Sequence, residues 1–156
     1  MPASQYPYNI PVGFSFKVVF PLFALLDGNE AMFQDVSGIN VQIETTEIQE
    51  GGVSSTYKLP NRVKYENLVL KRGLLKGSSL YFWMKNSFSN FDFRPMDILV
   101  MLIDERGIPS VTWMFRKAYP VAVKISEFKS TENAVVIETL ELAYNYFERV
   151  DTPSFI

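Results

Sequence analysis

Alternation of apolar and polar side chains is the feature that most constrains the fold of this chain. From Val12 to Phe20 every second residue is apolar, whereas residues 13, 15 and 17 are small or polar. A period of two is typical of a β-strand with one buried face. The same pattern recurs at residues 39–43, 111–115 and 121–125. The chain is therefore expected to be mainly β.

Two other segments complete the expected set of elements. Residues 96–103 are apolar on both faces, as in a central strand, and residues 104–107 form a turn into the next strand. Leu80, Trp83, Met84 and Phe88 recur at three- and four-residue spacing, which predicts one short helix capped by Ser78 or Ser79 and running to residue 88. Six or seven strands with one helix describe an antiparallel β-barrel or sandwich.

Residues 49–61 interrupt the strand pattern. They read QEGGVSSTYKLPN, in which paired glycines, paired serines and a proline leave too little apolar surface to build a core. This composition predicts a long exposed loop or hairpin. The next strand is expected from Lys64 to Lys71, with Leu68 and Leu70 on one face.

The segment from Asn133 to Val150 has conflicting preferences. Ala134 and residues 140–143 favour a helix, whereas residues 135–137 and Thr139 favour a strand. Propensity alone favours the helix here.

The length of the chain indicates one domain. With 156 residues, of which 47% are hydrophobic, it is long enough for one core and too short for two. Residues 1–11, which contain three prolines, are expected to form an N-terminal arm. Residues 12–150 are expected to form a single barrel domain, and residues 151–156 a C-terminal tail.

Composition argues against catalysis and against a metal or cofactor. The chain has no histidine and no cysteine, so the commonest general base, the thiol nucleophile and the usual zinc, copper and haem ligands are missing. Residues 73–78 lack the residue order of a phosphate-binding loop. Glu44 and Glu47 lie on opposite faces of an expected strand, so with Glu50 they are interpreted as a solvated acidic edge. We expect no enzyme activity and no cofactor.

Charge and hydropathy limit the partners. The net charge of −2 offers no basic excess for nucleic acid. The apolar runs are shorter than the roughly 20 residues that span a bilayer. The first residues do not resemble a signal peptide, so synthesis and folding in a reducing cytoplasm are expected.

Charge is distributed unevenly along the chain. Residues 27–50 contain six acidic and no basic residues, and residues 57–76 contain six basic residues and one acidic residue, Glu66. These segments either pair within one subunit or allow an acidic face of one copy to meet a basic face of the next. The 13 Phe and eight Tyr residues suggest aromatic surface buried between subunits, with a Phe-rich core as the alternative.

A set of short motifs, in a fixed order, carries a family resemblance. In the first half these are residues 33–38 (FQDVSG), Glu44, residues 50–52 (EGG), 59–60 (LP), 64–65 (KY) and 70–73 (LKRG). In the second half they are residues 102–105 (LIDE), Gly107, residues 111–113 (VTW), 118–120 (AYP), Val123, and residues 133–134 (NA) leading to 137–144 (IETLELAY). Over about residues 12–147 the chain resembles the tail-tube proteins of contractile bacteriophages and of extracellular contractile injection systems.

The resemblance implies an antiparallel β-barrel with one flanking helix, similar to the secreted ring protein of type VI secretion. It implies hexameric rings that stack into a hollow tube inside a contractile sheath, with baseplate or spike proteins as further partners. It also implies a strand, not a helix, from Ala134 to Tyr144. The particle would assemble in the bacterial cytoplasm and end up as an extracellular injection particle or virion tail.

In this family the long loop, here Glu47 to Asn61, is expected to leave the barrel and contact neighbouring subunits. The residues expected at ring-closing and ring-stacking contacts are Glu47, Glu50, Gly51, Gly52, Tyr57, Lys58, Leu59, Pro60, Lys64, Tyr65, Lys71, Arg72 and Gly73.

Three departures from the main-tube pattern resemble minor tube proteins at the baseplate end. They are Tyr144 where a His is usual, Pro60-Asn61 in place of Pro-Gly, and a longer segment from Phe20 to Phe33. Both a main tube subunit and a tube-initiator subunit remain open. The alternative from another class is a monomeric β-barrel that binds a small apolar ligand among its aromatic residues.

Overall fold

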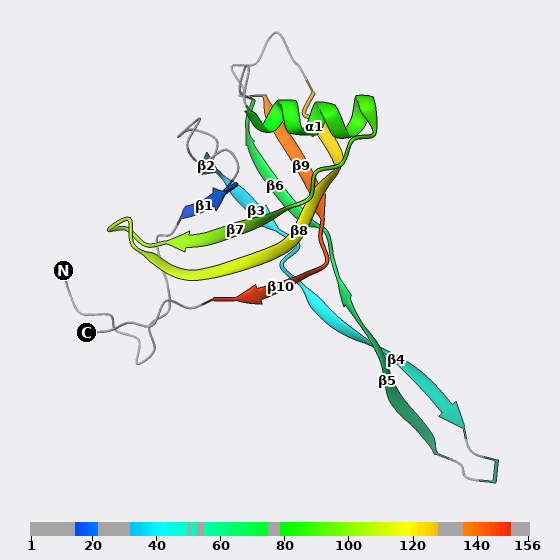
Figure 1. Cartoon of the computed structure of the whole chain (residues 1–156). Helices are drawn as coiled ribbons and strands as arrows, with labels where there is room; N and C mark the ends of the chain where they lie inside the picture. The colour runs from blue at the N-terminus through cyan, green and yellow to red at the C-terminus, as the bar shows by residue number, and fades with distance from the viewer. Residues whose placement is uncertain are drawn as a thin grey trace.

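A computed structural model describes residues 15–21, 32–49, 51–52, 55–74, 79–127 and 136–150 (Figure 1). The expected N-terminal arm and C-terminal tail, and the first residues of the strand expected from Val12, lie outside the described residues. In chain order the elements are β1 (Ser15–Val19), β2 (Met32–Phe33), β3 (Asp35–Ser37), β4 (Val41–Gln49), β5 (Thr56–Tyr65), β6 (Leu68–Gly73), α1 (Ser79–Asn90), β7 (Met96–Ile103), β8 (Pro109–Ile125), β9 (Ile137–Ala143) and β10 (Tyr146–Arg149).

The main sheet is antiparallel and its two ends are joined by the chain itself. Its strand order is β2-β1-β7-β8-β9-β6-β3, with β10 paired to β8. The strands β2 and β3 stand at opposite ends of this order, yet only Gln34 separates them in sequence. β2 pairs with β1, β3 pairs with β6, and the Gln34 N–H donates to the Lys71 carbonyl oxygen at 2.9 Å. The antiparallel barrel expected from the sequence is confirmed.

Strand β8 bends so that it serves two parts of the barrel. Its first half pairs with β7, and its second half pairs with β9. At the bend, Lys117 has φ 55°, and its N–H donates to Asp97 Oδ1 at 3.1 Å. Arg116 Nη1 donates to Asp97 Oδ2 at 2.9 Å. The bond from Lys117, followed by the contact with Arg116, holds the pKa of Asp97 below its usual value.

The core follows the alternation read from the sequence. The side chains of Ile98 and Val100 in β7 are fully buried, and their neighbours Leu99 and Met101 are half-buried. β6 buries Leu68 and Leu70, as predicted, and β9 buries Leu140 and Leu142. Apolar side chains of β1, β8 and α1 complete the same cluster. The barrel interior is therefore filled by packed side chains.

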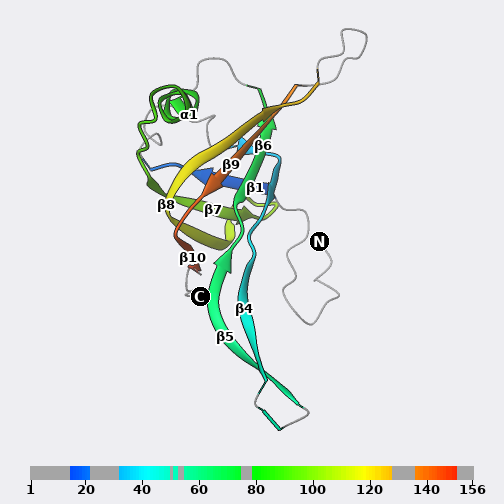
Figure 2. The ribbon, with the colours of Figure 1, turned by 90° about the vertical axis from the view of Figure 1, so that its right-hand side faces the viewer.

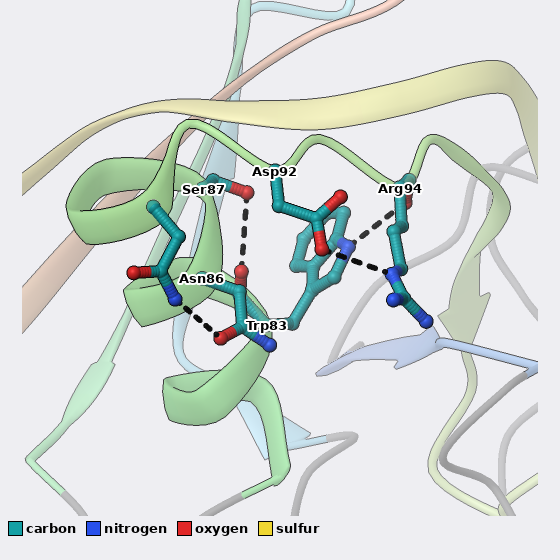
Figure 3. Close-up of polar contacts among 6 residues, drawn as sticks. Trp83, Asn86, Ser87, Asp92 and Arg94 are labelled. Atoms are coloured by element: carbon teal, nitrogen blue, oxygen red, sulfur yellow. Dashed lines mark hydrogen bonds and ion pairs between the residues drawn. The ribbon is translucent and has the colours of Figure 1, made fainter.

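The predicted helix is confirmed and ends two residues later than expected. Leu80, Trp83 and Met84 are buried, but Phe88, which shares their spacing, is 48% exposed. Ser87 takes that place, because it lies four residues after Trp83 on the same helical row, and its hydroxyl donates to the Trp83 carbonyl oxygen at 3.1 Å. Trp83 Nε1 donates to the Arg94 carbonyl oxygen at 2.9 Å and ties the helix to the following segment (Figure 3).

The ambiguous segment near the C-terminus is a strand. β9 lies between β6 and β8 and pairs with both, so its backbone groups are satisfied by two neighbours. The helix favoured by propensity was wrong, and the strand implied by the family resemblance is confirmed for residues 137–143. A further short strand, β10, follows it and was not expected.

The segment predicted as a loop or hairpin is a hairpin that projects from the barrel (Figure 1, Figure 2). β4 and β5 form a separate two-stranded sheet, and β5 begins at Thr56, inside the expected loop. The single strand expected from Lys64 to Lys71 is broken at residues 66–67, where the chain passes from the hairpin into β6. No helix in the described ranges is both long and apolar enough to cross a membrane.

Candidate functional site

The β4–β5 hairpin presents two long strand edges. In the part of the chain that the structure describes, β4 and β5 pair only with each other, so their outer backbone groups are open to another strand. The two edges differ in side chains. β5 carries Pro60 and three basic residues, which discourage pairing, whereas β4 contains neither proline nor lysine. The outer edge of β4 is the better edge for strand addition.

Most of the expected contact residues lie on this hairpin. Glu47 is on β4, and Tyr57, Lys58, Leu59, Pro60, Lys64 and Tyr65 are on β5. Gly51 and Gly52 are exposed in the connecting turn, and Glu50 lies outside the described residues. Gly52 has φ +91°, a conformation that favours glycine. Lys71, Arg72 and Gly73 lie apart from the hairpin, on β6 of the barrel.

Charges on the hairpin pair within the subunit. Arg62 Nε donates to Glu44 Oε2, and Lys64 Nζ lies 3.9 Å from Glu44 Oε1. The hydrogen bond from Arg62 lowers the pKa of Glu44, and the same bond raises the pKa of Arg62. Glu47 faces Lys58 across the two strands. Of the two alternatives for the uneven charge distribution, internal pairing is therefore observed for Glu44.

Arg72 is a residue of the subunit interior, which corrects its assignment to a subunit contact. Its side chain is 3% exposed, and Nε lies 3.3 Å from Oε2 of Glu138, whose side chain is 7% exposed. The guanidinium carbon also lies 5.3 Å from the centre of the Phe33 ring. These contacts join β2, β6 and β9 where the barrel edges meet. The available signal was the alternation along β6, which places Arg72 on the same face as Leu68 and Leu70.

An aromatic cluster holds the hairpin to the barrel. The Tyr65 ring, at the barrel end of β5, makes edge-to-face contacts with Tyr144 and Phe147 at centroid distances of 6.0 and 5.4 Å. Phe115 packs on both of these rings from β8. The Tyr144 hydroxyl donates to the Glu66 carbonyl oxygen at 2.6 Å. Burial raises the pKa of Tyr144 to about 12.

Polar contacts brace the other side of the hairpin base. The Glu66 N–H donates to the Asn40 carbonyl oxygen at 3.3 Å, and Asn40 Nδ2 donates to Glu66 Oε2 at 2.8 Å. Asn67 Nδ2 donates to Glu141 Oε1 at 2.9 Å. Gly38 has φ +87°, and a Cβ there would lie 2.0 Å from the Asn67 carbonyl oxygen, so only glycine fits. Together with the aromatic cluster, these contacts fix the direction in which the hairpin leaves the barrel.

A hollow of about 600 Å³ lies at this base, and it is open to solvent. Its lining combines polar and charged residues with one aromatic ring: Ser37, Gly38, Asn40, Lys64, Tyr65, Glu66, Asn67, Val69 and Glu141. The alternative function, an apolar ligand held in a barrel, needs a closed aromatic pocket. This hollow does not have that character.

Sequence reasoning missed two exposed apolar surfaces. One is on the hairpin, with Val41, Ile43 and Val63 on one pleat face and Ile48, Tyr57 and Leu59 on the other, each 43–59% exposed. The other is on and just after α1 and consists of Tyr81, Phe82, Phe88 and Phe91. The high aromatic content was the available signal, but only the fold separates the core rings from the exposed ones.

Solved structures share this fold across nearly the whole chain. A chain in the anti-feeding prophage (AFP) baseplate structure is 24% identical, with a TM-score of 0.76 over 94% of this chain and 98% of that chain. A chain in the sheath-tube complex of the PVC extracellular contractile injection system is 25% identical, with a TM-score of 0.73 over 94% of both chains. Hcp1 from Salmonella typhimurium is 12% identical, with a TM-score of 0.56 over 88% of this chain and 86% of that chain.

The family assignment comes from the sequence itself. Curated proteins provide no match. Residues 12–148, however, match the family described as T4-like virus tail tube protein gp19. This range agrees with the motif set read from the sequence, and the resemblance stated on those motifs is confirmed. The chain belongs to the T4-like virus tail tube protein gp19 family.

Proposed function

We propose that this chain forms hexameric rings that stack into the hollow inner tube of a contractile injection system or phage tail. Its family makes it a structural tube subunit and not an enzyme. The observation that carries the hexamer is the likeness, over 94% of this chain, to a chain in the AFP baseplate structure, which is described as 6-fold symmetrised. Hexameric rings would need a heterologous contact repeated around a closed circle.

Within such a tube, we assign the chain to the ring nearest the baseplate. Three sequence departures support this position: Tyr144, the Pro60-Asn61 pair and the long segment from Phe20 to Phe33. The likeness to the AFP baseplate chain supports it too. The main tube is the second candidate, because a chain of the PVC sheath-tube complex is similarly close.

The partners and location follow from this role. A tube subunit of this kind contacts like or paralogous rings, a contractile sheath, and baseplate or spike proteins. Synthesis in the bacterial cytoplasm and release in an extracellular particle or virion tail complete the proposal. The mechanism needs no chemical step, because sheath contraction would drive a rigid tube through a target envelope. Stiffness would come from strands of adjacent subunits that continue as one sheet around the lumen.

The hairpin is the proposed stacking element. It projects from the barrel, its base is braced on two sides, and the outer edge of β4 is open (Figure 1). The proposed contact residues there are Glu47, Glu50, Gly51, Gly52, Tyr57, Lys58, Leu59, Pro60, Lys64 and Tyr65, with Lys71 and Gly73 on the barrel. Arg72 is removed from this set because it is buried.

Light scattering with negative-stain imaging of the purified chain tests the assembly. Rings of six subunits or stacks of rings are expected, and short stacks favour the baseplate position over the main tube. A chain that stays monomeric at high concentration and binds an apolar ligand contradicts the proposal and favours the ligand-binding barrel.

A triple substitution in the turn tests the hairpin. Replacing Glu50, Gly51 and Gly52 together with alanine strains the backbone at Gly52, whose φ is +91°. The barrel is still expected to fold, because both glycines are exposed in the turn and a Cβ at either one meets no atom within 4 Å. Stacking is expected to stop. Circular dichroism checks the fold and imaging checks the stacks, and unimpaired stacks from the folded variant would refute the role of the turn.

A further inference from the structure

Two short links join the hairpin to the barrel, one before β4 and one after β5 (Figure 1). The hydrogen bonds between Asn40 and Glu66 run from one link to the other, so they extend the β4–β5 pairing by one residue and hold the two hairpin strands together. Asn67, which donates to Glu141 of β9, adjoins Leu68, which is already paired in β6, so this bond fixes the barrel end of its link. None of these bonds ties the last pair of the hairpin to a barrel strand.

Tyr144 makes the hydrogen bond that reaches the hairpin from the barrel. It lies between β9 and β10, at a corner that both Figure 1 and Figure 2 place beside the base of the hairpin. Its hydroxyl donates to the carbonyl oxygen of Glu66, whose own N–H donates to Asn40 in the last hairpin pair. The Tyr144 ring also contacts Tyr65, the final residue of β5. Among the hydrogen bonds of the described residues, this one alone joins the β9–β10 corner to the last pair of the hairpin.

The Tyr144 side chain is held more firmly than the hairpin that it contacts. Its ring packs edge-to-face on Phe115, which is fully buried, at a centroid distance of 4.8 Å. The next residue, Asn145, donates its N–H to the Arg116 carbonyl oxygen of β8 at 2.9 Å. The hairpin base, in contrast, borders the open hollow of about 600 Å³. The hydroxyl is therefore presented from a fixed part of the barrel to a segment that is packed on fewer sides.

The length of the hairpin makes its direction sensitive to this bond. β4 has nine residues, which extend over ~30 Å at ~3.3 Å per residue. A rotation of roughly 10° at the base moves the far end by ~5 Å, close to the ~4.8 Å spacing of paired strands. Stacking through the outer edge of β4 therefore needs a hairpin direction that is set to within a few degrees.

We propose that the Tyr144 hydroxyl directs the hairpin for stacking, so that Tyr144 is a positioning residue of the tube and not one of its contact residues. This inference rests on the proposed tube. Removing the hydroxyl leaves the ring on Phe115 but releases the Glu66 carbonyl oxygen, and the hairpin then takes a range of directions. A hydrogen bond between neutral groups shifts such an equilibrium by about 2- to 12-fold. With half of the hairpins misdirected, all six of a hexamer point correctly in about one ring in 60.

A distance measurement within one subunit tests the direction of the hairpin. Because the chain contains no cysteine, spin labels can be placed at Thr46→Cys on β4 and Lys124→Cys on β8, both exposed positions outside the proposed contacts. Pulsed electron paramagnetic resonance is recorded with the labelled full chain diluted into a large excess of the same chain without labels. The parent is expected to give one narrow distance distribution, and Tyr144→Phe a broad one.

Tyr119→Phe is the matched control. It also removes one phenol hydroxyl from a β8 ring, but that hydroxyl forms no hydrogen bond within the described part of the chain, where the Tyr119 ring packs on Phe93. The control is expected to keep the narrow distribution of the parent.

Assembly and stability are measured on the same variants without labels. In negative-stain images of a dilution series, Tyr144→Phe should form rings like the parent but need at least a ~10-fold higher concentration to form stacks. Its melting temperature should stay within ~5 °C of the parent, because one hydrogen bond is lost and the aromatic packing remains.

Each contrary result overturns a defined part of the inference. An unchanged distance distribution in Tyr144→Phe would overturn the positioning role. A broad distribution with stacks at the concentration of the parent would overturn its link to stacking. Melting more than ~10 °C below the parent would assign the hydroxyl to the stability of the barrel instead. A parent that forms neither rings nor stacks would contradict the proposed tube, while the distance distributions would still decide whether Tyr144 directs the hairpin.

Discussion

The ion pair between Arg72 and Glu138 yields the sharpest test of the barrel. Arg72→Met removes the cation and keeps a long apolar side chain in its place. It leaves Glu138, whose side chain is 7% exposed, without the guanidinium that neutralises its carboxylate. Breaking a buried pair from one side costs about 3–5 kcal/mol, most of it the penalty of the remaining buried charge.

This loss is large for a domain of this size. For 150–250 residues, about 2–4 °C of melting temperature corresponds to 1 kcal/mol, so the variant should melt roughly 10 °C below the parent. Removing both charges in Arg72→Met/Glu138→Leu should recover most of the loss, because replacing a buried pair with apolar side chains of similar volume is often neutral. The two substitutions should therefore be strongly non-additive, with the double variant far more stable than the sum of the two single effects predicts.

The assay is thermal melting monitored by circular dichroism. Tryptophan fluorescence is a second probe, because Trp83 is buried in the core. All variants are compared at one protein concentration, because assembly makes the melting temperature concentration-dependent. Arg62→Met is the matched control. It breaks the pair with Glu44, but Arg62 is 72% exposed, so no measurable shift is expected.

The reasoning has a clear point of failure. If Arg72→Met melts within 2 °C of the parent, a threshold of roughly 1 kcal/mol, the pair is not a buried element of the barrel. If, in addition, this variant abolishes ring assembly, Arg72 is a contact residue after all, and the assignment made from the sequence would be restored.

Three further predictions concern the hairpin base and the bend of β8. Gly38→Ala should destabilise the fold by more than the roughly 1–3 kcal/mol typical of a positive-φ residue, because its Cβ would meet the Asn67 carbonyl oxygen. The control is Gly52→Ala, which has a similar φ but open space around its Cβ, and equal melting temperatures of the two variants would refute the close approach at Gly38. The pKa of Tyr144 is raised in the fold, so its contribution to stability is complete below its ordinary pKa of 10.0 and is lost as the pH rises toward 12. The free energy of unfolding in urea should therefore fall at alkaline pH in the parent and fall less in Tyr144→Phe. The same pH dependence in both proteins would contradict this. The pKa of Asp97 is lowered in the fold, so its contribution to stability is present above pH 3.8, its ordinary pKa, and is lost as the pH falls below that value. The melting temperature of Asp97→Asn should therefore fall less at acid pH than that of the parent. An equal fall in both proteins would argue against the contacts of Asp97 with Lys117 and Arg116.

The sequence was sufficient for elements whose pattern is local. Ile98 and Val100 alternate with side chains of the opposite face, and the predicted strand from Met96 to Ile103 has the observed bounds. The apolar spacing of Leu80, Trp83 and Met84 likewise identified the helix. In each case the period of the buried side chains is set by the backbone geometry of the element itself, so the pattern can be read without knowing the neighbours.

Family motifs added what local pattern could not supply. Residues 137–143 contain good helix formers, and their propensity gave the wrong element. Pairing with β6 on one side and β8 on the other satisfies the backbone and buries Leu140 and Leu142, which outweighs a propensity difference of a few tenths of a kcal/mol per residue. The ordered motifs identified the family and therefore the strand.

Only the tertiary structure decided which polar residues are buried and where the exposed apolar surfaces lie. Arg72 reads as one of six basic residues in its segment, yet closure of the barrel places it between Phe33 and Glu138. Val41, Ile43 and Val63 alternate with polar residues as core positions would, yet they are exposed because the hairpin projects from the barrel (Figure 1). Alternation, spacing and motif order are properties of neighbours in sequence, whereas burial and the facing of surfaces depend on segments that are distant in sequence and adjacent only in the folded chain.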